Sequence, residues 1–577
     1  MSVLPSDAGR LRVGVVVAGN VVAAWITGLL DDLTAAGAVE LTEVTVAPNE
    51  SCSARLPASL SRSQRMLARG DERLFCGRAQ LLAPVDLRSW ARERGIRVAE
   101  SWGESPAESA IRGRDALKNT ADVILDVSGG DGSSATCARA RFAVWWLEGA
   151  PVRVGGVHAD LPEVVTAVLR GSRVIGFTLR ARCPGRAATV TLAGAICPTH
   201  PSSPLVTGVY LAASARQLIV EKLTNASPES LRRDVSLGVT NRAPTELEAG
   251  AAELAPASPR TPTLRRAGAN SSIAATSAFF ARVAGRQVRK AVSEQRWNLL
   301  IGEQAPEQML PDPARLRPIW PPPGRYWADP FAVQHDGRTH ILFEEFLYEE
   351  RRGRIAVMTL DEHGRLGPAR IALELDSHLS YPCAFEREGR LYMVPENAES
   401  GSLDLYECME LPDRWVRRRS LLEGVQVVDA SLVEWQGLWW MFASLKKPAG
   451  LLSADLLVLY FSEDPVNGVW RKHPLSPLLA DVTNARPAGA PFVFSERLFR
   501  LAQDGSKGYG SAIAVNEVLS LTPAHFAERR VTRVQPRCAQ ALCGTHTLNR
   551  TGRTVVMDEC RYVRRSLRRT RVDRMLG

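Results

Sequence analysis

Two aspartates, Asp329 and Asp429, occupy matching positions in two copies of a repeated segment, and they are the best candidates for chemistry in this sequence. Carboxyl groups that face each other about 5–9 Å apart can act on a glycosidic bond. Their mutual repulsion raises the pKa of one carboxyl group and leaves the other ionised, as separate acid and base roles require. Glu396 ends a strand in the copy between them. The predicted catalytic residues are therefore Asp329, Asp429 and Glu396.

Other polar and aromatic side chains fall at the ends of the same predicted strands. The guanidinium of Arg486 could hold a neighbouring carboxylate or a phosphate with two hydrogen bonds. His546 lies two residues past the matching position of the last copy, so strand alternation places it on the same face. A charge at a strand end is often only solvated, and an aromatic group can belong to the core, which we expect for Trp439 and Trp440. The predicted substrate-binding residues are Trp327, Tyr381, Arg486, Gln503, Asp504 and His546.

The elements that must position these groups are short strands in a repeat. Turn-then-strand units recur about every 50 residues, which is typical of β-propeller blades. The units begin at Gly337, Gly389, Gly437, Glu496 and Gly552. Another strand precedes each turn, so each unit contains a hairpin. The second strands end at Glu344, Glu396, Ser444, Gln503 and Glu559. We therefore predict a five-bladed all-β propeller over residues 297–563, with a ring of polar groups around a central funnel.

The segments Trp327–Pro330 and Asp429–Gly437 resemble the five-bladed propellers of arabinanases, xylosidases, invertases and levansucrases. The resemblance implies that Asp329 is a base or nucleophile and that Asp429 tunes the acid and holds the sugar. In the arabinanase-type enzymes a Glu in a Glu-Gly-Pro setting donates the proton, whereas this chain has Arg486–Gly489 there. Sugar binding or transfer is therefore favoured over ordinary hydrolysis, with Glu396 as the substitute acid.

A second resemblance covers nearly the whole predicted propeller. It rests on the motifs Trp327–Phe331, Ser380–Pro382, Tyr392–Glu396, Ala485–Gly489, Arg500–Asp504 and Tyr509–Gly510. As a set they are similar to the N-terminal domain of plant glucosamine inositolphosphorylceramide transferases and its bacterial relatives. The resemblance implies a bacterial protein of glycolipid or surface-polysaccharide synthesis.

Residues 10–222 alternate buried-strand and helix patterns, which predicts an α/β domain with a mostly parallel sheet. Strands are expected near residues 12–17, 121–126, 154–158 and 174–179. Ser128–Gly132 follows one of them and is either a ligand-binding loop or a simple turn.

This region also resembles the formyltransferase domain of sugar N-formyltransferases and methionyl-tRNA formyltransferase. The likeness rests on Val13–Val17, Asp122–Asp126, Val144–Trp146 and Ile175–Thr178. Those enzymes use an Asn, a His and an Asp, and the Asn-x-His and Asp-x-Gly motifs are missing from the corresponding stretches here. The resemblance therefore implies a degenerate domain. The alternative is an amino-sugar formyltransferase that binds 10-formyltetrahydrofolate; no other cofactor and no metal is expected.

Composition bounds the class of protein. A chain of 577 residues is too long for a single core, and 45% hydrophobic with 23% charged residues fits a globular protein. No apolar run is long enough to span a bilayer and no signal-peptide pattern is present, so we expect a cytoplasmic protein. The ten cysteines lack CxxC pairs, which favours reduced thiols over a zinc site or disulfides.

The remaining segments are predicted from charge and composition. Residues 223–271 are poor in large apolar groups and are expected to be a flexible linker, and residues 272–296 a connecting helix. Much of the net charge of +10 falls in the basic tail, residues 564–577. That tail is either solvated or a basic helix on an anionic membrane surface. Nucleic acid is not an expected partner, because no pattern of base-stacking aromatics accompanies the arginines.

Three functions fit this sequence. In the first, the funnel binds and transfers a nucleotide-activated or lipid-linked sugar in the synthesis of a surface glycan or glycolipid. In the second, the funnel only binds glycans, as a scaffold. In the third, the chain is a sugar N-formyltransferase and the propeller is an accessory domain that positions the acceptor.

Overall fold

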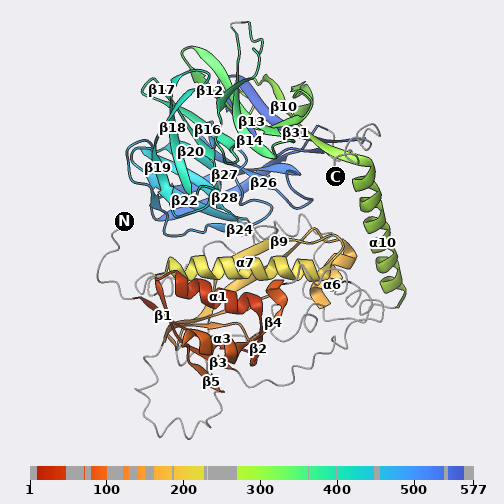
Figure 1. Cartoon of the computed structure of the whole chain (residues 1–577), viewed down its shortest axis with the longest axis vertical. Coiled ribbons are helices and arrows are strands. Elements are labelled where there is room, and N and C mark those ends of the chain that lie inside the picture. The colour runs from red at the N-terminus through yellow and green to blue at the C-terminus, as the bar shows by residue number, and fades with distance from the viewer. Residues whose placement is uncertain are drawn as a thin grey trace. The chain divides into compact units, whose positions relative to one another are not determined.

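The computed structural model divides the chain into two compact units, each described by itself (Figure 1). Unit 1 comprises Met1–Val283 with Ala449–Ala454, and unit 2 comprises Ala284–Pro448 with Asp455–Gly577. The structure describes residues 10–46, 71, 80–100, 121–128, 140–149, 162–184, 188–226, 231, 269–361, 363–397, 399–446, 455–537 and 543–564. Nearly all of the predicted linker and of the predicted basic tail lies outside the described residues.

Unit 1 contains a mixed sheet. Its strands run parallel in the order β5–β3–β1–β6–β7, and β8 and β9 extend the sheet with antiparallel pairing. The strands are β1 (Leu11–Val17), β3 (Val39–Val46), β5 (Val98–Glu100), β6 (Ala121–Asp126), β7 (Ala140–Glu148), β8 (Val174–Arg182) and β9 (Thr189–Pro198). Nearly every side chain of β1 and β6 is buried, as expected for strands that are covered on both faces.

Helices of unit 1 pack against this sheet. They are α1 (Ala24–Ala35), η2 (Gln80–Leu82), α3 (Leu87–Arg94), α6 (Pro162–Arg170) and α7 (Pro204–Thr224), and a short ribbon pairs β2 (Val21–Ala23) with β4 (Pro84–Asp86). Ser203 caps α7 by accepting the Val206 N–H, and α7 lies beside α1, where Arg216 and Asp32 form an ion pair of 2.7 Å (Figure 1). Among the described helices, none combines the length and apolarity needed to cross a lipid bilayer.

Three of the strands expected in the N-terminal half fall on β1, β6 and β8. The expected strand near residues 154–158 and the loop beyond Ser128 lie outside the described residues. The likeness of this unit to formyltransferases stays a prediction.

Helix α10 (Ala269–Val292) precedes a series of antiparallel sheets in unit 2. Three separate sheets have four strands each: β12 (Arg325–His335), β13 (Arg338–Leu347), β14 (Arg352–Thr359), β15 (Arg370–Leu373); β16 (Ser380–Arg387), β17 (Arg390–Glu396), β18 (Ser402–Glu410), β19 (Arg414–Glu423); and β25 (Phe492–Phe494), β26 (Arg497–Asp504), β27 (Ala512–Thr522), β28 (His525–Val534). A fourth joins β10 (Ser293–Glu303), β11 (Arg317–Ile319), β29 (Cys543–Gly544), β30 (Leu548–Thr551) and β31 (Thr554–Arg564), and η3 (Pro313–Arg315) precedes β11.

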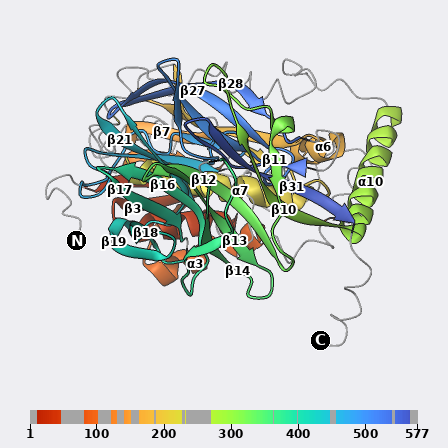
Figure 2. The same cartoon turned by 90° about the horizontal axis from the view of Figure 1, so that it is seen from above.

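The strands of the predicted third blade pair in a different pattern from these sheets. Here β20 (Val427–Trp435), β21 (Leu438–Leu445) and β22 (Leu456–Ser462) pair in sequence, and β23 (Arg471–Lys472) and β24 (Leu479–Asp481) pair with β22. The described part of unit 2 contains four separate sheets, so the predicted count of five separate blades is not confirmed. The propeller-type arrangement is confirmed, since the first strands β12, β16 and β20 contact one another in turn. Figure 2 shows β12 next to β16.

The predicted hairpins are present because their turns carry residues suited to a left-handed backbone. Asp336 and Gly337, with φ of 49° and 71°, join β12 to β13, and Glu388 and Gly389, with φ of 52° and 74°, join β16 to β17. Two consecutive positive φ angles define the two-residue turn whose twist matches a hairpin. Hydrophobic cores then fill the space between consecutive sheets; for example, Leu342 of β13 and Met393 of β17 belong to one buried cluster. Trp439 and Trp440 are buried, as predicted.

Candidate functional site

Three consecutive first strands carry the same backbone irregularity. The pairing register shifts between Ala328 and Phe331 in β12, and at the matching places in β16 and β20. Inside each shift one non-glycine residue has a positive φ: 49° at Asp329, 43° at Tyr381 and 53° at Asp429. Such a conformation costs roughly 1–3 kcal/mol and is concentrated at functional sites. The repeat therefore holds these three side chains in equivalent, strained positions.

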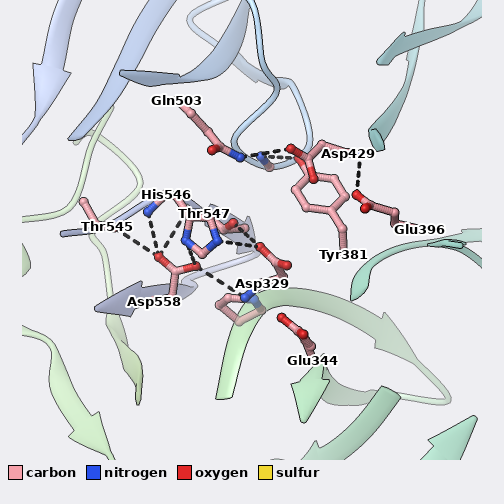
Figure 3. A network of polar contacts seen from close by, with 12 residues as sticks. Asp329, Glu344, Tyr381, Glu396, Asp429, Gln503, Thr545, His546, Thr547 and Asp558 are labelled. Atoms are coloured by element: carbon pink, nitrogen blue, oxygen red, sulfur yellow. Dashed lines mark hydrogen bonds and ion pairs between the residues drawn. The ribbon is translucent and has the colours of Figure 1, made fainter. Parts of the chain in front are cut away.

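These bulges bring together a group that we call the carboxylate cluster. It consists of Asp329, Glu344, Glu396, Asp429, Arg486, Gln503, His546 and Asp558. Figure 3 shows these carboxylates, Gln503 and His546 close to one another, although they come from different strands of unit 2. Asp329 and Asp429, which are 100 positions apart in the chain, thus belong to one cluster.

Asp329 is 5% exposed and is held by groups from the end of the chain. The Thr547 hydroxyl donates to its Oδ1 over 2.7 Å, and His546 Nε2 lies 3.3 Å from the same oxygen. Burial, together with the nearby Asp429 and Asp558, raises the pKa of Asp329 to about 6, although His546 acts in the opposite direction. At neutral pH this carboxyl group is mostly ionised and close to its titration range.

Asp558 fixes His546 in this arrangement. Its Oδ1 accepts the backbone N–H of His546 over 2.8 Å and of Thr547 over 3.1 Å, and its Oδ2 lies 2.6 Å from His546 Nδ1. Burial alone would lower the pKa of His546, but Asp558 and Asp329 raise it to about 9. The imidazole is therefore protonated at neutral pH and lies between two carboxyl groups.

The same three side chains are the types that bind divalent cations. Among the described residues, Asp329, His546 and Asp558 have possible ligand atoms within 4.8 Å of one another. In this structure the imidazole of His546 forms ion pairs with both carboxyl groups, at 3.3 Å to Asp329 and 2.6 Å to Asp558.

The sequence interpretation placed Glu559 in the ring, and the structure corrects this to Asp558. Glu559 faces the other side of β31, where Arg537 lies 2.8 Å from its carboxylate and Arg561 lies 2.8 Å from the same oxygen. Burial would raise the pKa of Glu559, but these two arginines lower it. Gly544 pairs with Cys560 and Leu548 pairs with Met557, so the three residues between Gly544 and Leu548 lie opposite two residues of β31. This extra residue changes which side chains of β31 face the cluster, and Asp558 takes the place expected for Glu559.

Asp429 is 2% exposed and has a different set of partners. Arg486 Nε donates to its Oδ2, and Gln503 Nε2 donates to the same oxygen over 3.0 Å. Of the two partners predicted for Arg486, the structure shows the carboxylate. The backbone N–H of Asp429 donates to Glu396 Oε2 over 3.0 Å. Burial and the charge of Asp429 raise the pKa of Glu396 well above its usual range, against the effect of Arg486.

Glu344 completes the cluster between the first two sheets. The Tyr326 hydroxyl donates to its Oε1 over 3.1 Å, and His378 Nε2 lies 3.6 Å from the same oxygen. Burial and the neighbouring Asp329 raise the pKa of Glu344 well above its usual range. Glu344 and Glu396 therefore bind a proton more tightly than an exposed glutamate does.

Three of the predicted substrate-binding residues are not part of the carboxylate cluster. Tyr381 is fully buried; its hydroxyl hydrogen-bonds Ser431 over 2.8 Å and accepts the Gly489 N–H, so it links neighbouring blades. Trp327 belongs to a blade core because its indole N–H donates to Glu345 over 3.1 Å and its ring packs against Phe343. Asp504 alternates with Gln503 along β26, points away, and lies 3.1 Å from Arg533.

Fold and site together describe a propeller-type unit with a buried group of carboxylates of unequal pKa. The family model described as "Glucosamine inositolphosphorylceramide transferase 1, N-terminal" matches residues 321–549. Proteins named glucosamine inositolphosphorylceramide transferase 1 are similar: 32% identical over 209 residues in Oryza sativa subsp. japonica, and 29% over 212 residues in Arabidopsis thaliana. Each match covers 36% of this chain and 28% of the relative. The predicted resemblance of the propeller is confirmed, and the chain spans little more than a quarter of these relatives.

Solved structures of glycoside hydrolases align with low scores. A family 117 glycoside hydrolase, Zg3597, from Zobellia galactanivorans has 12% identity and a TM-score of 0.30, covering 47% of this chain and 90% of that one. The Cellvibrio cellulosa α-L-arabinanase has 11% identity and a TM-score of 0.27, covering 35% and 77%. Similarity this low adds nothing to the sheet arrangement described above.

Proposed function

We propose that the carboxylate cluster binds a sugar and that the protein acts in the synthesis of a glycolipid or surface glycan. The similarity of residues 321–549 to the N-terminal region of a transferase named for glucosamine and inositolphosphorylceramide supports the ligand class. The observation that carries the proposal is the pair of aspartates, Asp329 and Asp429, buried in equivalent strained positions with contrasting partners. Hydrogen-bonding groups of fixed geometry are what recognition of sugar hydroxyls needs.

The cluster also supports a transfer reaction at this site. Asp329, with a pKa of about 6, would take the proton of an acceptor hydroxyl as that oxygen attacks the anomeric carbon. Glu396, whose pKa is raised well above its usual range, would give a proton to the departing oxygen. Asp429 would orient the sugar, because Arg486 and Gln503 fix its carboxylate. Unequal pKa values in one site are the pattern expected of an acid and a base.

Binding and transfer can be separated with the full chain. Wild-type protein should bind at least one glycan on a printed array, and Asp429→Asn should weaken the strongest interaction about tenfold or more in calorimetry, because a buried sugar contact is lost. Asp336→Asn, in the exposed turn between β12 and β13, is the control and should bind normally. Absence of any glycan binding by the wild type would reject the proposal. If Asp329→Asn alters affinity while the wild type shows no turnover with lipid-linked or nucleotide sugars, the scaffold function holds instead.

Several finer features belong to the same proposal: a bacterial source, a cytoplasmic location, a peripheral membrane contact and a degenerate formyltransferase-like unit 1. For the last, calorimetry of the full chain with 10-formyltetrahydrofolate should show no binding. A saturable signal would favour the formyltransferase function.

A further inference from the structure

The charged groups of the carboxylate cluster are mostly hidden, but one aromatic residue against them is open. Asp329, Asp429 and His546 are at most 5% exposed, whereas Tyr509 is 57% exposed. Tyr509 lies between β26 and β27, in the segment that follows Gln503 and Asp504. It is the most exposed of the aromatic rings that contact the cluster residues among those described.

The ring of Tyr509 is in contact with both cations of the cluster. The Arg486 guanidinium lies over it, 5.3 Å from the ring centroid. The His546 ring meets it in an edge-to-face arrangement at 5.0 Å and 63°, and the partly buried Trp297 does so at 6.3 Å and 69°. A guanidinium over an aromatic face and edge-to-face rings are favourable geometries that fix the orientation of the ring.

The backbone beside Tyr509 is held in place because Gly510 packs closely against Trp297 and His546. Gly510 has a φ of 62°, and a Cβ added there would lie 2.8 Å from Trp297 Cη2 and 3.3 Å from His546 Cβ. The carbonyl oxygen of Gly510 accepts the Thr545 N–H over 2.7 Å. Only glycine fits this conformation and this spacing. The contact ties Tyr509 to the segment that carries His546, so the exposed ring is a fixed surface.

We propose that Tyr509 is the stacking platform of the sugar site, on which the apolar C–H face of a pyranose ring lies. This inference rests on the proposed function and names the part of the ligand that this residue contacts. One face of the ring is occupied by Arg486, and the rest of the exposed surface is free to meet a ligand. A pyranose has an apolar face bordered by hydroxyl groups, and the partly exposed Arg486, which lies over this ring, offers hydrogen-bond donors for those hydroxyls.

The test uses the full chain and four methyl glycosides, those of glucosamine, glucose, galactose and mannose, as probes. Calorimetry should show that Tyr509→Ala weakens the best-bound glycoside about tenfold, since loss of one aromatic contact and its buried area is worth about 1.4 kcal/mol. Tyr509→Phe should remain within about twofold, because the ring and not the hydroxyl makes the stack. Tyr562→Ala, a 40% exposed tyrosine on β31 outside these contacts, should bind like the wild type.

A second readout separates stacking from a change in fold. In saturation-transfer difference NMR, the protons of one face of the bound glycoside should be the most strongly saturated in the wild type, and this preference should be absent in Tyr509→Ala. If Tyr509→Ala binds normally while Asp429→Asn does not, the platform is rejected and the proposed function stands. An equal loss in Tyr509→Phe and Tyr509→Ala would assign the hydroxyl instead and also reject stacking. Failure of the wild type to bind any of the four glycosides would reject monosaccharide recognition and the platform together.

Discussion

Asp329 and Asp429 have the same residue type, nearly the same φ and the same place in a blade, yet their surroundings are opposite. Asp329 faces a histidine and a second aspartate, so its charge can change near neutral pH. Asp429 faces an arginine, which stays protonated at any physiological pH. The comparison teaches that the repeat determines where a carboxylate points, whereas residues from other blades determine its charge. The following four changes test that difference.

The largest effect is expected on the Asp429 side. Arg486→Met leaves a buried carboxylate without its ion pair, so the free energy of unfolding should fall by about 3–5 kcal/mol. Urea unfolding followed by tryptophan fluorescence measures this. The exposed pair Arg414 and Glu410 gives the control, because Arg414→Met should cost less than about 1 kcal/mol. If the double variant Arg486→Met/Asp429→Asn is no more stable than Arg486→Met, an unpaired Asp429 carboxylate is not the cause of the lost stability.

The Asp329 side should respond to pH. Because its pKa in the folded protein is about 6, above the ordinary aspartate value of 3.8, folded Asp329 binds a proton more tightly than the unfolded chain does. As pH rises from 4 to 7, the wild type should therefore lose up to about 3 kcal/mol of unfolding free energy relative to Asp329→Asn. Denaturation at several pH values tests this. Asp336→Asn, at a side chain that is 87% exposed, should run parallel to the wild type. If the unfolding free energy of Asp329→Asn also changes with pH in parallel with that of the wild type, the pKa of Asp329 is not raised.

A smaller effect is expected for the residue that supports Asp329 through His546. Asp558→Asn removes a charged partner, so the pKa of His546 should fall from about 9, and unfolding free energy at pH 6 should fall by about 2 kcal/mol. A histidine with a raised folded pKa stabilises most below pH 6.5, and this contribution is lost as pH rises through 9. Nitrogen chemical shifts of labelled histidine, assigned with His546→Gln, report the pKa. An unchanged value in Asp558→Asn would show that Asp558 does not determine it.

The smallest change removes one hydrogen bond beside Asp329. Tyr326→Phe takes away the donor to Glu344 and should cost about 1 kcal/mol while raising the pKa of Glu344 further. Thermal unfolding at pH 7 measures the loss. Tyr562→Phe, which removes a hydroxyl in contact with Gln295 at the surface, should have less effect. If Tyr326→Phe and Tyr562→Phe lower the unfolding free energy equally, the buried hydrogen bond to Glu344 stabilises the protein no more than a surface one does.

The sequence predicts those parts of the site that follow the repeat. Asp329, Asp429 and Glu396 could be placed together because hairpins with left-handed turns recur at a constant interval and alternation within a strand has a period of two. Arg486 could be assigned a carboxylate partner from its chemistry alone. These inferences need only local pattern and the assumption of a closed ring.

Features that break the repeat could not be predicted. Asp558 enters the cluster because extra residues near Thr545 change the alternation, and a single sequence does not show where a strand takes up an insertion. Tyr509 belongs to the motif Tyr509–Gly510, but its surroundings come in part from Trp297, more than 200 positions away, so its place beside the cluster could not be predicted. The third blade could be predicted as a hairpin, but the pairing of both β23 and β24 with β22 could not.

The pairing of β10 with β31 has a consequence for how the protein is made. Ser293 pairs with Arg564 and Glu303 with Thr554, so the first strand of unit 2 pairs with a strand that is synthesised about 250 residues later. Until β31 has left the ribosome, that edge of β10 has no partner, and Asp558, which lies on β31, cannot reach His546. The arrangement around Asp329 therefore forms only after β31 has been made, so a truncation before β31 removes both the β10–β31 pairing and Asp558.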